Sequence, residues 1–405
     1  MTTDLLQKQT FSVAASTDFM MPGTVRFGVN SFLSLGDELE KLGVTKVAVI
    51  SDKGLEKVGL VDRAVEVVHA NGKPSTTFTE IAGEPTFDLL AESIGHVKAE
   101  GCDAIVGIGG GSALDVAKAT AAALLDKDDL SSYFSGEKTV LQRTVSCILL
   151  PTTSGTGAEV TKNAIFEDTE NEVKRGLVSA SFLPDVAIID PALTLSCPSR
   201  VTAASGVDAF THAIESYVAV NATPITKMYA EKAMRLFAPN IASAVHNGKD
   251  LEGRIGMSWV SVLAGVSLAN AGVGAVHALA YPLGGKYHIE HGVANALLMP
   301  FVFEVTGETR MSEMVNVASF LQLGDYSNNP HEALEAVVSY LYQLLGKLNL
   351  PTSLSELGIS KEDLPDLAHQ ASKIDRLLSN TPYKLSEEMI LSIYLNAYKG
   401  VKQRD

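Results

Sequence analysis

Residues 103–112 read Asp-Ala-Ile-Val-Gly-Ile-Gly-Gly-Gly-Ser, and a helical pattern follows over Ser112–Leu125. The apolar run Asp103–Ile108 predicts a buried strand that leads through a glycine loop directly into a helix. Similar strand and helix patterns lie on both sides of this unit. Such alternation predicts an α/β fold in which parallel βαβ units place helices on both faces of one sheet. The other strands expected are Lys46–Ser51, Ser75–Phe78, Val145–Pro151 and Val186–Asp190, and the helices before the loop are Leu55–Asn71 and Thr86–Glu100.

The pattern changes towards the second half of the chain. Asn163–Val178 predicts a hairpin with its turn at Asp168–Asn171, and after Pro191 long helical periods replace the strand patterns. We therefore expect an α/β domain over residues 1–191 and an all-helical domain over residues 192–405. The helices expected in the second domain are Ser199–Val220, Pro224–Asn247, Leu251–Ala271, Val276–Leu283, Val293–Val305, Arg310–Leu321, His331–Leu348, Lys361–Ala371 and Ser386–Lys399.

The composition excludes several classes of protein. The 405 residues are 46% hydrophobic and 20% charged, which is typical of a globular protein with large cores and excludes a mainly disordered chain. The formal net charge of −15 disfavours binding to nucleic acid or an anionic membrane. Three scattered cysteines suggest neither a disulfide framework nor a thiolate metal site. With no signal peptide or transmembrane run in the pattern, we expect a cytoplasmic protein.

The glycine loop is the first candidate binding site. Gly109, Gly110 and Gly111 let the backbone approach a phosphate closely, and the following helix offers free N–H groups at its N-terminus. Ser112 is expected to cap this helix or to donate to a phosphate oxygen. The loop departs from the GxGxxG fingerprint because Ser112 replaces the third glycine. A tight turn without a ligand is the alternative.

Two further segments follow predicted strands and point to the same edge of the sheet. Asp52 ends a strand, where its carboxylate can accept hydrogen bonds from a ribose diol and would repel a 2′-phosphate, which favours NAD over NADP. Its alternative role is to cap a helix or a turn. Residues 151–159 read Pro-Thr-Thr-Ser-Gly-Thr-Gly-Ala-Glu, a flexible loop rich in donors that suits phosphate or ribose. A threonine-rich surface turn is the other interpretation.

Histidines and one aspartate suggest a metal centre in the helical half. Asp208 and His212 are four residues apart on an expected helix and therefore share one face. His277 lies where a later helix begins, and His291 follows 14 residues on. One carboxylate with three imidazoles suits Fe²⁺ or Zn²⁺. The spacing leaves two alternatives open: Asp208 and His212 as an ordinary surface pair, and His288 in place of His291.

Four motifs in order resemble those of the iron-containing (group III) alcohol dehydrogenase family. They are Gly109–Ser112 with Asp115 and Lys118, Pro151–Thr161, Gly206–Glu215, and His277–Ala280 followed by His291–Ala296. The resemblance runs over nearly the whole chain. It implies a Rossmann-like dinucleotide-binding domain and a helical catalytic domain, as in dehydroquinate synthase, with the active site in the cleft between them.

The resemblance also implies roles for individual residues. It selects Asp208, His212, His277 and His291 as ligands of Fe²⁺, with Zn²⁺ as the other candidate, and so prefers His291 to His288. It matches the glycine loop, with Gly109, Gly110, Gly111, Ser112 and Asp115, to the pyrophosphate of NAD, and Asp52 to the acid that marks NAD preference. The remaining cofactor contacts that it implies are Thr152, Thr153, Thr156 and Lys174.

One position departs from the family pattern. Many members have a second histidine four residues after the third ligand, where it is thought to help relay the substrate proton, and this chain has Tyr281 there. A phenol with an ordinary pKa of about 10 is a poor base at neutral pH. We therefore expect Tyr281 to line the pocket or to take part in an altered proton route, with His288 as a substitute relay.

The activity implied by the resemblance is hydride transfer between a primary alcohol or diol and NAD, with the metal polarising the substrate oxygen. Alternatives are a zinc-dependent, glycerol dehydrogenase-type polyol oxidoreductase, a non-redox NAD-binding relative, and a non-catalytic nucleotide-binding protein. The expected partners are a small alcohol or aldehyde and a second copy of the chain in a homodimer or higher oligomer. The strand-like Thr24–Gly28 is a candidate for pairing with that second copy.

Overall fold

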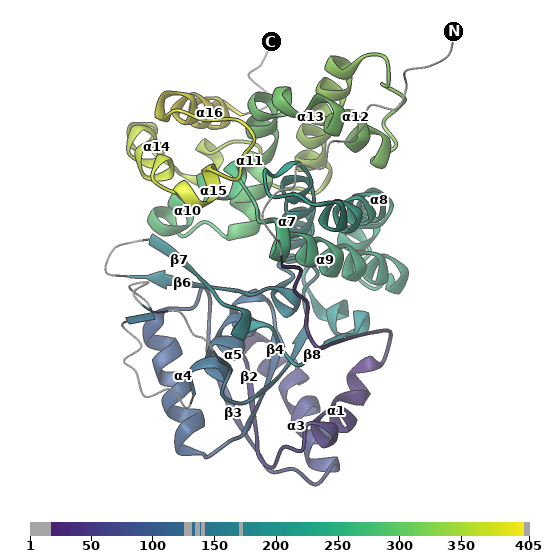
Figure 1. Ribbon diagram of the computed structural model, residues 1–405, viewed down its shortest axis with the longest axis vertical. Helices are drawn as coiled ribbons and strands as arrows, with labels where there is room; N and C mark the ends of the chain where they lie inside the picture. The colour runs from purple at the N-terminus through teal and green to yellow at the C-terminus, as the bar shows by residue number, and fades with distance from the viewer. Residues whose placement is uncertain (1–17, 125–131, 134–137, 139–141, 170–172, 401–405) are drawn as a thin grey trace.

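The computed structural model describes residues 18–124, 132–133, 138, 142–169 and 173–400. In Figure 1 an α/β half lies below a helical half, and a short hairpin lies between them on one side. Within the described residues, a six-stranded parallel sheet has the order β1-β8-β5-β4-β2-β3. The strands of this sheet are β1 (Thr24–Phe27), β2 (Val47–Asp52), β3 (Ser75–Ile81), β4 (Ala104–Gly109), β5 (Ser146–Pro151) and β8 (Val186–Ile189).

The order of the strands creates a crevice at one point of the sheet. From β2 the chain runs outward to the edge strand β3 and then returns to β4 on the other side of β2. The carboxyl ends of β2 and β4 therefore flank a topological switch point, where ligands of open α/β sheets bind. Asp52 ends β2, and the glycine loop begins at the end of β4. The fold thus brings these two sequence features to one crevice.

Helices cover both faces of the sheet, as the alternating pattern predicts. The side chains of Val47 and Val49 on β2 pack with α1 and α3, whereas Ala48 and Ile50 point to the opposite face, in the core that includes α4 and α5. The expected helix Leu55–Asn71 is wrong as a single element, because Gly59 adopts a left-handed φ of 75° and divides it. The helices of this half are α1 (Leu35–Lys41), α2 (Lys53–Lys57), α3 (Leu60–Ala70), α4 (Phe87–Ala99) and α5 (Gly111–Ala123).

The hairpin and the first strand complete the α/β half. The predicted hairpin is present as β6 (Asn163–Asp168) antiparallel to β7 (Val173–Val178); part of its turn lies outside the described residues. The first strand lies at one edge of the sheet. β1 pairs in parallel with β8 of the same chain along one side. Its pairing with a second copy of the chain therefore stays a prediction.

The helical half follows the expected periods closely, and Leu251–Ala271 has the predicted bounds. Expected bounds elsewhere differ by one or two turns at most, and the four-residue α15 was too short to show a period. The helices are α7 (Ser199–Val218), α8 (Pro224–His246), α9 (Leu251–Ala271), α10 (Ala275–Tyr287), α11 (His291–Thr306), α12 (Met311–Phe320), α13 (Pro330–Lys347), α14 (Leu364–Ser372), α15 (Asp375–Leu378) and α16 (Glu387–Lys399). Short 3₁₀ turns are η1 (Ser31–Ser34), η2 (Ala158–Val160), η3 (Ala180–Phe182), η4 (Pro191–Ser196), η5 (Gly307–Arg310), η6 (Ser355–Leu357) and η7 (Lys361–Asp363).

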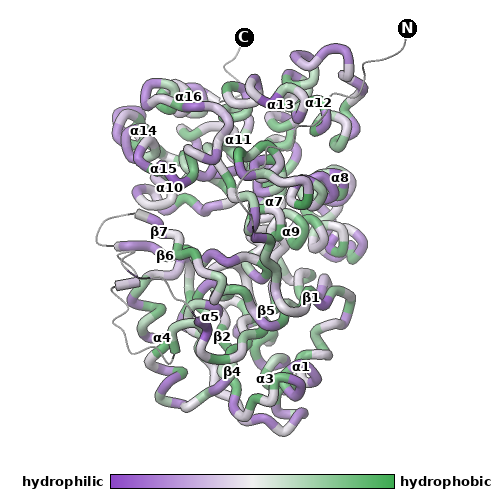
Figure 2. The backbone as a smooth tube through the Cα atoms, in the orientation of Figure 1, coloured by the Kyte–Doolittle hydropathy of each residue, from purple (hydrophilic) through white to green (hydrophobic). Residues whose placement is uncertain are grey.

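One continuous hydrophobic core joins the helices of this half. Phe210 on α7, Phe237 on α8 and Phe301 on α11 are buried in it. Figure 2 shows hydrophobic segments concentrated along the inner elements and hydrophilic ones along outer helices such as α8 and α14. Among the described helices, none is by itself long and apolar enough to cross a membrane; α9 and α10 pass that test together, by length and composition only, with a bend of 100° between them.

Candidate metal centre and nucleotide cleft

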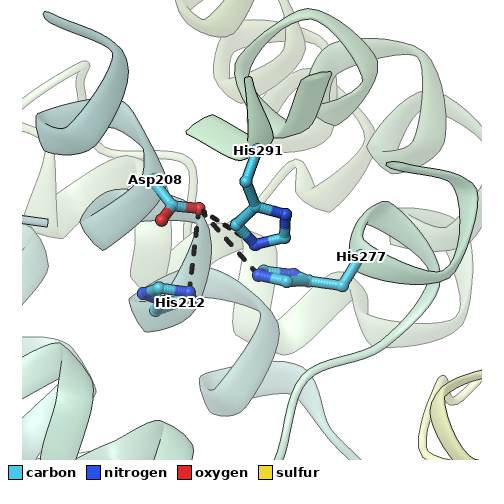
Figure 3. A group of neighbouring side chains, drawn as sticks. All are labelled: Asp208, His212, His277 and His291. Atoms are coloured by element: carbon cyan, nitrogen blue, oxygen red, sulfur yellow. Dashed lines mark ion pairs between the residues drawn. The ribbon is translucent and has the colours of Figure 1, made fainter. Parts of the chain in front are cut away.

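Four side chains from three helices converge in the helical half. Asp208 and His212 lie one turn apart on α7, His277 is the third residue of α10, and His291 is the first residue of α11. One donor atom from each lies within 4.8 Å of the others. Figure 3 shows the carboxylate of Asp208 facing all three imidazole rings. The structure therefore brings together the four residues named from the sequence.

The spacing of the donor atoms suits a transition metal. Asp208 Oδ1 lies 3.7 Å from His212 Nε2 and 3.9 Å from Nε2 of both His277 and His291. Ligands at about 2.1 Å from a zinc-like cation lie roughly 3–3.5 Å apart, so a small contraction would close the group on a metal. One carboxylate oxygen and three imidazole nitrogens form the donor set that a borderline divalent cation prefers.

Burial and mutual charge give these groups the protonation states that a metal needs. Burial disfavours the ionised carboxylate of Asp208, but the neighbouring histidines outweigh that effect and lower its pKa. Burial also lowers the pKa of His212, and it lowers the pKa of His291 to about 4. At neutral pH the centre therefore offers a carboxylate anion with neutral rings at His212 and His291, which are the forms that bind metals.

Glu215 fixes the orientation of one ligand. Its Oε2 lies 2.5 Å from Nδ1 of His277, and its Oε1 accepts a hydrogen bond of 2.7 Å from the backbone N–H of Val276. The carboxylate therefore holds the start of α10 and the imidazole together. With Nδ1 engaged in this way, Nε2 of His277 is left for the ligand cluster, as is common for metal-binding histidines.

Asn295 lies against the same cluster from α11. Its amide nitrogen donates to Asp208 Oδ1 at 2.7 Å and lies 3.1 Å from His277 Nε2 and 3.0 Å from His291 Nε2. Its own Oδ1 is buried and has no hydrogen-bond partner within the described part of the chain. The ligand atoms thus converge as acceptors around a point where positive charge is favoured, and a divalent cation fits that donor set.

The alternative histidine lies elsewhere. His288 ends α10 with a left-handed φ of 51°, its side chain is 76% exposed, and its Nδ1 lies 3.5 Å from Glu167 of β6. It belongs neither to the ligand cluster nor to a buried relay. Of the two candidates that the sequence left open, the fold brings His291 to Asp208.

The glycine loop has the close packing that a phosphate site requires. A Cβ atom on Gly109 would lie 2.5 Å from that of Ala113, and one on Gly111 would lie 2.8 Å from Cγ2 of Thr156. Gly110, not Ser112, is the N-cap of α5, so the expected capping role of Ser112 is wrong. The first intrahelical bond is donated by the N–H of Leu114, which leaves the N–H groups of the loop without helical acceptors.

Asp52 faces the same crevice and also caps a helix. Its Oδ1 accepts hydrogen bonds from the N–H groups of Gly54 (2.9 Å) and Leu55 (3.0 Å) at the start of α2. The cavity beside it is also lined by Gly110, Gly111 and Ser112. Both roles raised from the sequence are therefore compatible, because the cap uses Oδ1 and leaves Oδ2 for a ligand.

The threonines of the second polar loop, residues 151–159, differ in how close they lie to the central cavity. Thr156 lines the central cavity, and its hydroxyl accepts from the N–H of Ala158 at 3.3 Å. Thr152 is buried and donates its N–H to the carbonyl of Gly109 at 2.9 Å, while Thr153 lies beside Gly110. The second polar loop therefore packs against the glycine loop and places Thr156 at the cavity.

A cavity of about 200 Å³ lies between the two halves of the molecule. It is lined by Gly111 and Ser112 from the glycine loop and by the four residues of the metal-ligand cluster. Lys174 reaches it from β7 and forms an ion pair of 2.8 Å with Glu84. Asp115 also lines it, but its oxygens bind Lys118 at 3.0 Å and the N–H of Ile165 at 2.9 Å. These contacts are made within the protein, and the expected contact of Asp115 with the cofactor stays a prediction.

Comparison with known proteins agrees with this geometry. Residues 22–191 match the family "Iron-containing alcohol dehydrogenase", and residues 202–398 match "Fe-containing alcohol dehydrogenase family, C-terminal". The chain belongs to the iron-containing alcohol dehydrogenase family. It is an oxidoreductase, as expected, and the polyol and non-redox alternatives are not favoured.

Individual relatives of this iron-containing alcohol dehydrogenase cover nearly its full length. A long-chain-alcohol dehydrogenase of Geobacillus thermodenitrificans is 37% identical over 386 residues, which are 94% of this chain and 96% of the relative. A sulfoacetaldehyde reductase of Bilophila wadsworthia is 36% identical over 368 residues, 90% of this chain and 95% of the relative. The solved structure of a 1,3-propanediol oxidoreductase superposes with a TM-score of 0.90 at 32% identity, covering 95% of this chain and 100% of that one.

Several side chains at the centre of this iron-containing alcohol dehydrogenase escaped prediction. Glu215 and Asn295 lie inside motifs that the sequence singled out, yet their contacts with His277 and Asp208 depend on how α10 and α11 approach α7. Glu84 and Arg376 line the cavity from segments that carry no motif. Asn295 follows His291 by four residues, a spacing that places both side chains on one face of a helix. This spacing is the one local signal that could have found Asn295.

Proposed function

We propose that this enzyme oxidises a primary alcohol or diol, or reduces the corresponding aldehyde, with NAD and with Fe²⁺ held by Asp208, His212, His277 and His291. The observation that carries the proposal is the placement of these four donors within 4.8 Å of one another in a cavity that also reaches the glycine loop. In the direction of oxidation, the alcohol and NAD⁺ give an aldehyde, NADH and a proton.

The metal, when bound, supplies a Lewis acid that favours the ionised alcohol or polarises the aldehyde carbonyl. The chain's own residues prepare the site for it. Asp208 contributes the negative charge, and Glu215 keeps the His277 ring in one orientation. Asp208, His212 and His277 are almost fully buried, so most of the ligand cluster is shielded from bulk water. Electrostatic effects in such an environment are stronger than in water.

NAD is proposed to lie along the carboxyl edge of the sheet. Asp52 would bind the adenosine ribose, and Gly109, Gly110, Gly111 and Ser112 the pyrophosphate. Thr152, Thr153, Thr156 and Lys174 are the further proposed contacts towards the nicotinamide, with Asp115 holding the adjoining wall. Support comes from two adjacent cavities, one lined by Asp52 and the other by the metal-ligand cluster, which share Glu84, Gly111 and Ser112. A carboxylate at Asp52 disfavours NADP because it would repel a 2′-phosphate.

The position of Tyr281 supports a role as a wall residue and hydrogen-bond donor. Its ring lies 6.1 Å from that of His291 and lines the cavity. Burial raises the pKa of Tyr281, so the phenol stays protonated at neutral pH and is no general base. The substrate proton would therefore leave through solvent at the cavity mouth and not through a side chain at this position.

Other expectations remain proposals. The relatives are named for a long-chain alcohol, for a diol and for sulfoacetaldehyde, so family membership leaves the substrate of this chain open.

We propose a cytoplasmic homodimer, or a higher oligomer, with a division between a nucleotide-binding domain of residues 1–191 and a catalytic domain of residues 192–405. Gel filtration with light scattering would test the oligomeric state.

The test of the proposed function is turnover under controlled metal supply. Protein purified without oxygen is stripped with a chelator and then assayed at 340 nm with alcohols and aldehydes, with NAD or NADP and with Fe²⁺ or Zn²⁺ added. The proposal predicts turnover that requires Fe²⁺ and prefers NAD. Activity with Zn²⁺ alone would contradict the assignment of Fe²⁺ but would leave the proposed reaction standing. Activity with the stripped protein would contradict the metal-dependent mechanism.

A further inference from the structure

One positively charged side chain in the cavity is not explained by hydride transfer. Arg376, on the short helix α15, lines the same cavity as the metal-ligand cluster. Within the described residues no carboxylate lies within the 4.0 Å of an ion pair with its guanidinium. Because an arginine is always ionised, this cavity carries a permanent positive charge that its own wall leaves without an anion.

Two other charged groups of the cavity wall have partners within the chain. Lys174 is held by Glu84 at 2.8 Å, and Asp115 is held by Lys118 at 3.0 Å. Asp208 belongs to the metal-ligand cluster. The contrast is informative in a chain with a net charge of −15, in which acids outnumber bases by 47 to 32. Among the residues that the structure describes, Arg376 has no acidic partner even though acidic side chains are plentiful, so its charge is a local property of this cavity.

The guanidinium of Arg376 extends towards the hairpin. Its Nη2 lies only 3.3 Å from where a Cβ of Gly176 would be, so Arg376 reaches from α15 across to strand β7. It also lies close enough to the hydroxyl of Tyr281 on α10 for its positive charge to act on the pKa of that phenol, in the lowering direction. Figure 1 shows α15 next to α10 and above the β6–β7 hairpin. Tyr281 thus has Arg376 as one neighbour and His291 as another, with the ring of His291 6.1 Å from its own, and all three line the cavity.

We propose that Arg376, together with the hydroxyl of Tyr281, binds an anionic group at the far end of the substrate, so that the enzyme acts on short aldehydes or alcohols with a terminal carboxylate or sulfonate. This inference rests on the proposed dehydrogenase function. Both oxyanions match the planar fork of a guanidinium, which can donate two parallel hydrogen bonds to either of them. The substrate's reacting oxygen would face the metal-ligand cluster while its charged end faces Arg376.

The position of Arg376 at the mouth of the cavity suits this role. The residue as a whole is exposed, so a bound carboxylate or sulfonate keeps part of its hydration and needs no complete burial. The pyrophosphate of the cofactor has a separate site in the N–H groups of the glycine loop, at the start of α5. Arg376 is therefore available to a second anion, which the substrate supplies.

The test compares substrates that differ in charge and little in shape. Wild-type enzyme loaded with Fe²⁺ and saturated with NADH is assayed with 4-oxobutanoate, its methyl ester, 3-oxopropanesulfonate and butanal. The variants are Arg376→Gln, Arg376→Lys and Tyr281→Phe, with Arg235→Gln as control, because Arg235 is an exposed arginine ion-paired on α8. The two anionic aldehydes distinguish a carboxylate from a sulfonate as the preferred group.

We expect the wild type to prefer an anionic aldehyde to its neutral counterpart. Arg376→Gln should lower kcat/KM for the preferred anion by roughly 10- to 100-fold, the range for a lost hydrogen bond to a charged group, and should leave butanal unchanged. Arg376→Lys should retain part of the preference and Tyr281→Phe should weaken it. An equal loss on charged and neutral substrates, or a higher KM for NADH with every substrate, would overturn the inference while the dehydrogenase function stands.

Binding provides a readout that does not depend on turnover. Calorimetry of the enzyme–NADH complex with butanoate and with butanamide should show binding of butanoate to the wild type and its loss in Arg376→Gln. Turnover of neutral aldehydes without any preference for anions, or equal binding of the two ligands, would overturn the anionic subsite alone. No turnover with any aldehyde or alcohol would overturn the proposed function itself, and the inference with it.

Discussion

The two walls of the cleft build their sites in different ways. The α/β wall uses the backbone of four consecutive residues, Gly109–Ser112, whose shape depends on contacts such as that between Gly111 and Thr156. The helical wall uses side chains spread from Asp208 to His291, a separation of 291 − 208 = 83 residues. The first site is specified locally and the second by the packing of three helices. We therefore expect the two sites to respond to mutation independently.

The largest expected effect is at the helical wall. His277→Ala should abolish tight metal binding and lower kcat by on the order of 10³-fold or more, since a metal contributes several kcal/mol to the barrier. Metal content by mass spectrometry and turnover at 340 nm measure both quantities. NADH binding, followed by fluorescence, should persist because the glycine loop belongs to the α/β wall and is not built from the helices that carry the ligands.

The matched control is His369→Ala. His369 is an exposed histidine whose Nδ1 lies 3.0 Å from Glu387, away from the cavity. It should keep full metal content and activity. If His277→Ala kept its metal and its turnover, the ligand role of His277 would be wrong, and if it also lost NADH binding, the independence of the two walls would be wrong.

The second effect sharpens the comparison within the helical wall. Glu215→Gln keeps the shape of the side chain but weakens its grip on Nδ1 of His277, and a change behind a ligand typically costs about 10- to 100-fold in metal affinity. Competition with a chelator measures that affinity. Glu231→Gln, an exposed carboxylate paired with Arg235, is the control. Equal affinities in Glu215→Gln and wild type would show that the ligand orientation is set by packing alone.

The third effect tests the α/β wall. A Cβ added by Gly111→Ala would lie 2.8 Å from Cγ2 and 3.1 Å from Oγ1 of Thr156, so the loop must shift and the phosphate site should distort. We expect the KM for NAD to rise by roughly tenfold, which corresponds to about 1.4 kcal/mol, while metal content stays unchanged. Gly346→Ala, a helical glycine with open space around it, should leave the KM unaltered. A normal KM in Gly111→Ala would contradict a close approach of the phosphate here.

The smallest effect concerns the junction of the two walls, where Glu159 is buried near α9. Burial raises the pKa of Glu159 to about 7 from its usual value of 4.5, and its Oε1 has no hydrogen-bond partner within the described residues. The folded state therefore binds this proton more tightly than the unfolded state, so folding stability falls as the pH rises from about 4.5 to 7. Glu159→Gln removes that dependence, which is worth a few kcal/mol at most at about 1.4 kcal/mol per pKa unit.

The thermal midpoints of Glu159→Gln and wild type at pH 5 and pH 8 measure this difference. The variant should gain relative to the wild type as the pH rises. A constant difference between the two proteins across this range would show that Glu159 is already ionised in the folded state at pH 5.

The same contrast explains how far the sequence could predict the structure. The strand Asp103–Ile108 and its glycine loop could be predicted because an apolar run and three adjacent glycines are local signals. The spacing of Asp208 and His212 predicted that both lie on one helix face. That they lie close to His277 and His291 could be expected only from the resemblance to a family. Only the fold shows that Gly59 breaks a helix in two.

Contacts between distant segments could not be predicted. Asn295 and Glu215 act through the approach of three helices, and Arg376 reaches the cavity from a four-residue helix that leaves no period. Ser112 was expected to cap α5, but the tight strand-to-helix turn begins the helix at Gly111 and leaves Gly110 as its cap. For Asn295, Glu215 and Arg376 the deciding contacts are with residues far away along the chain. For Ser112 the start of the helix is decided by a backbone geometry that several residue types allow.

The most direct test of the central claim is to locate the metal in crystals of protein purified without oxygen and supplied with Fe²⁺ and NAD. Anomalous scattering measured on either side of the iron absorption edge identifies the element and its position together. The account predicts one iron per chain, coordinated by a carboxylate oxygen of Asp208 and by ring nitrogens of His212, His277 and His291. Iron bound at any other residues, or an iron-free cluster in an enzyme that turns over, would contradict it.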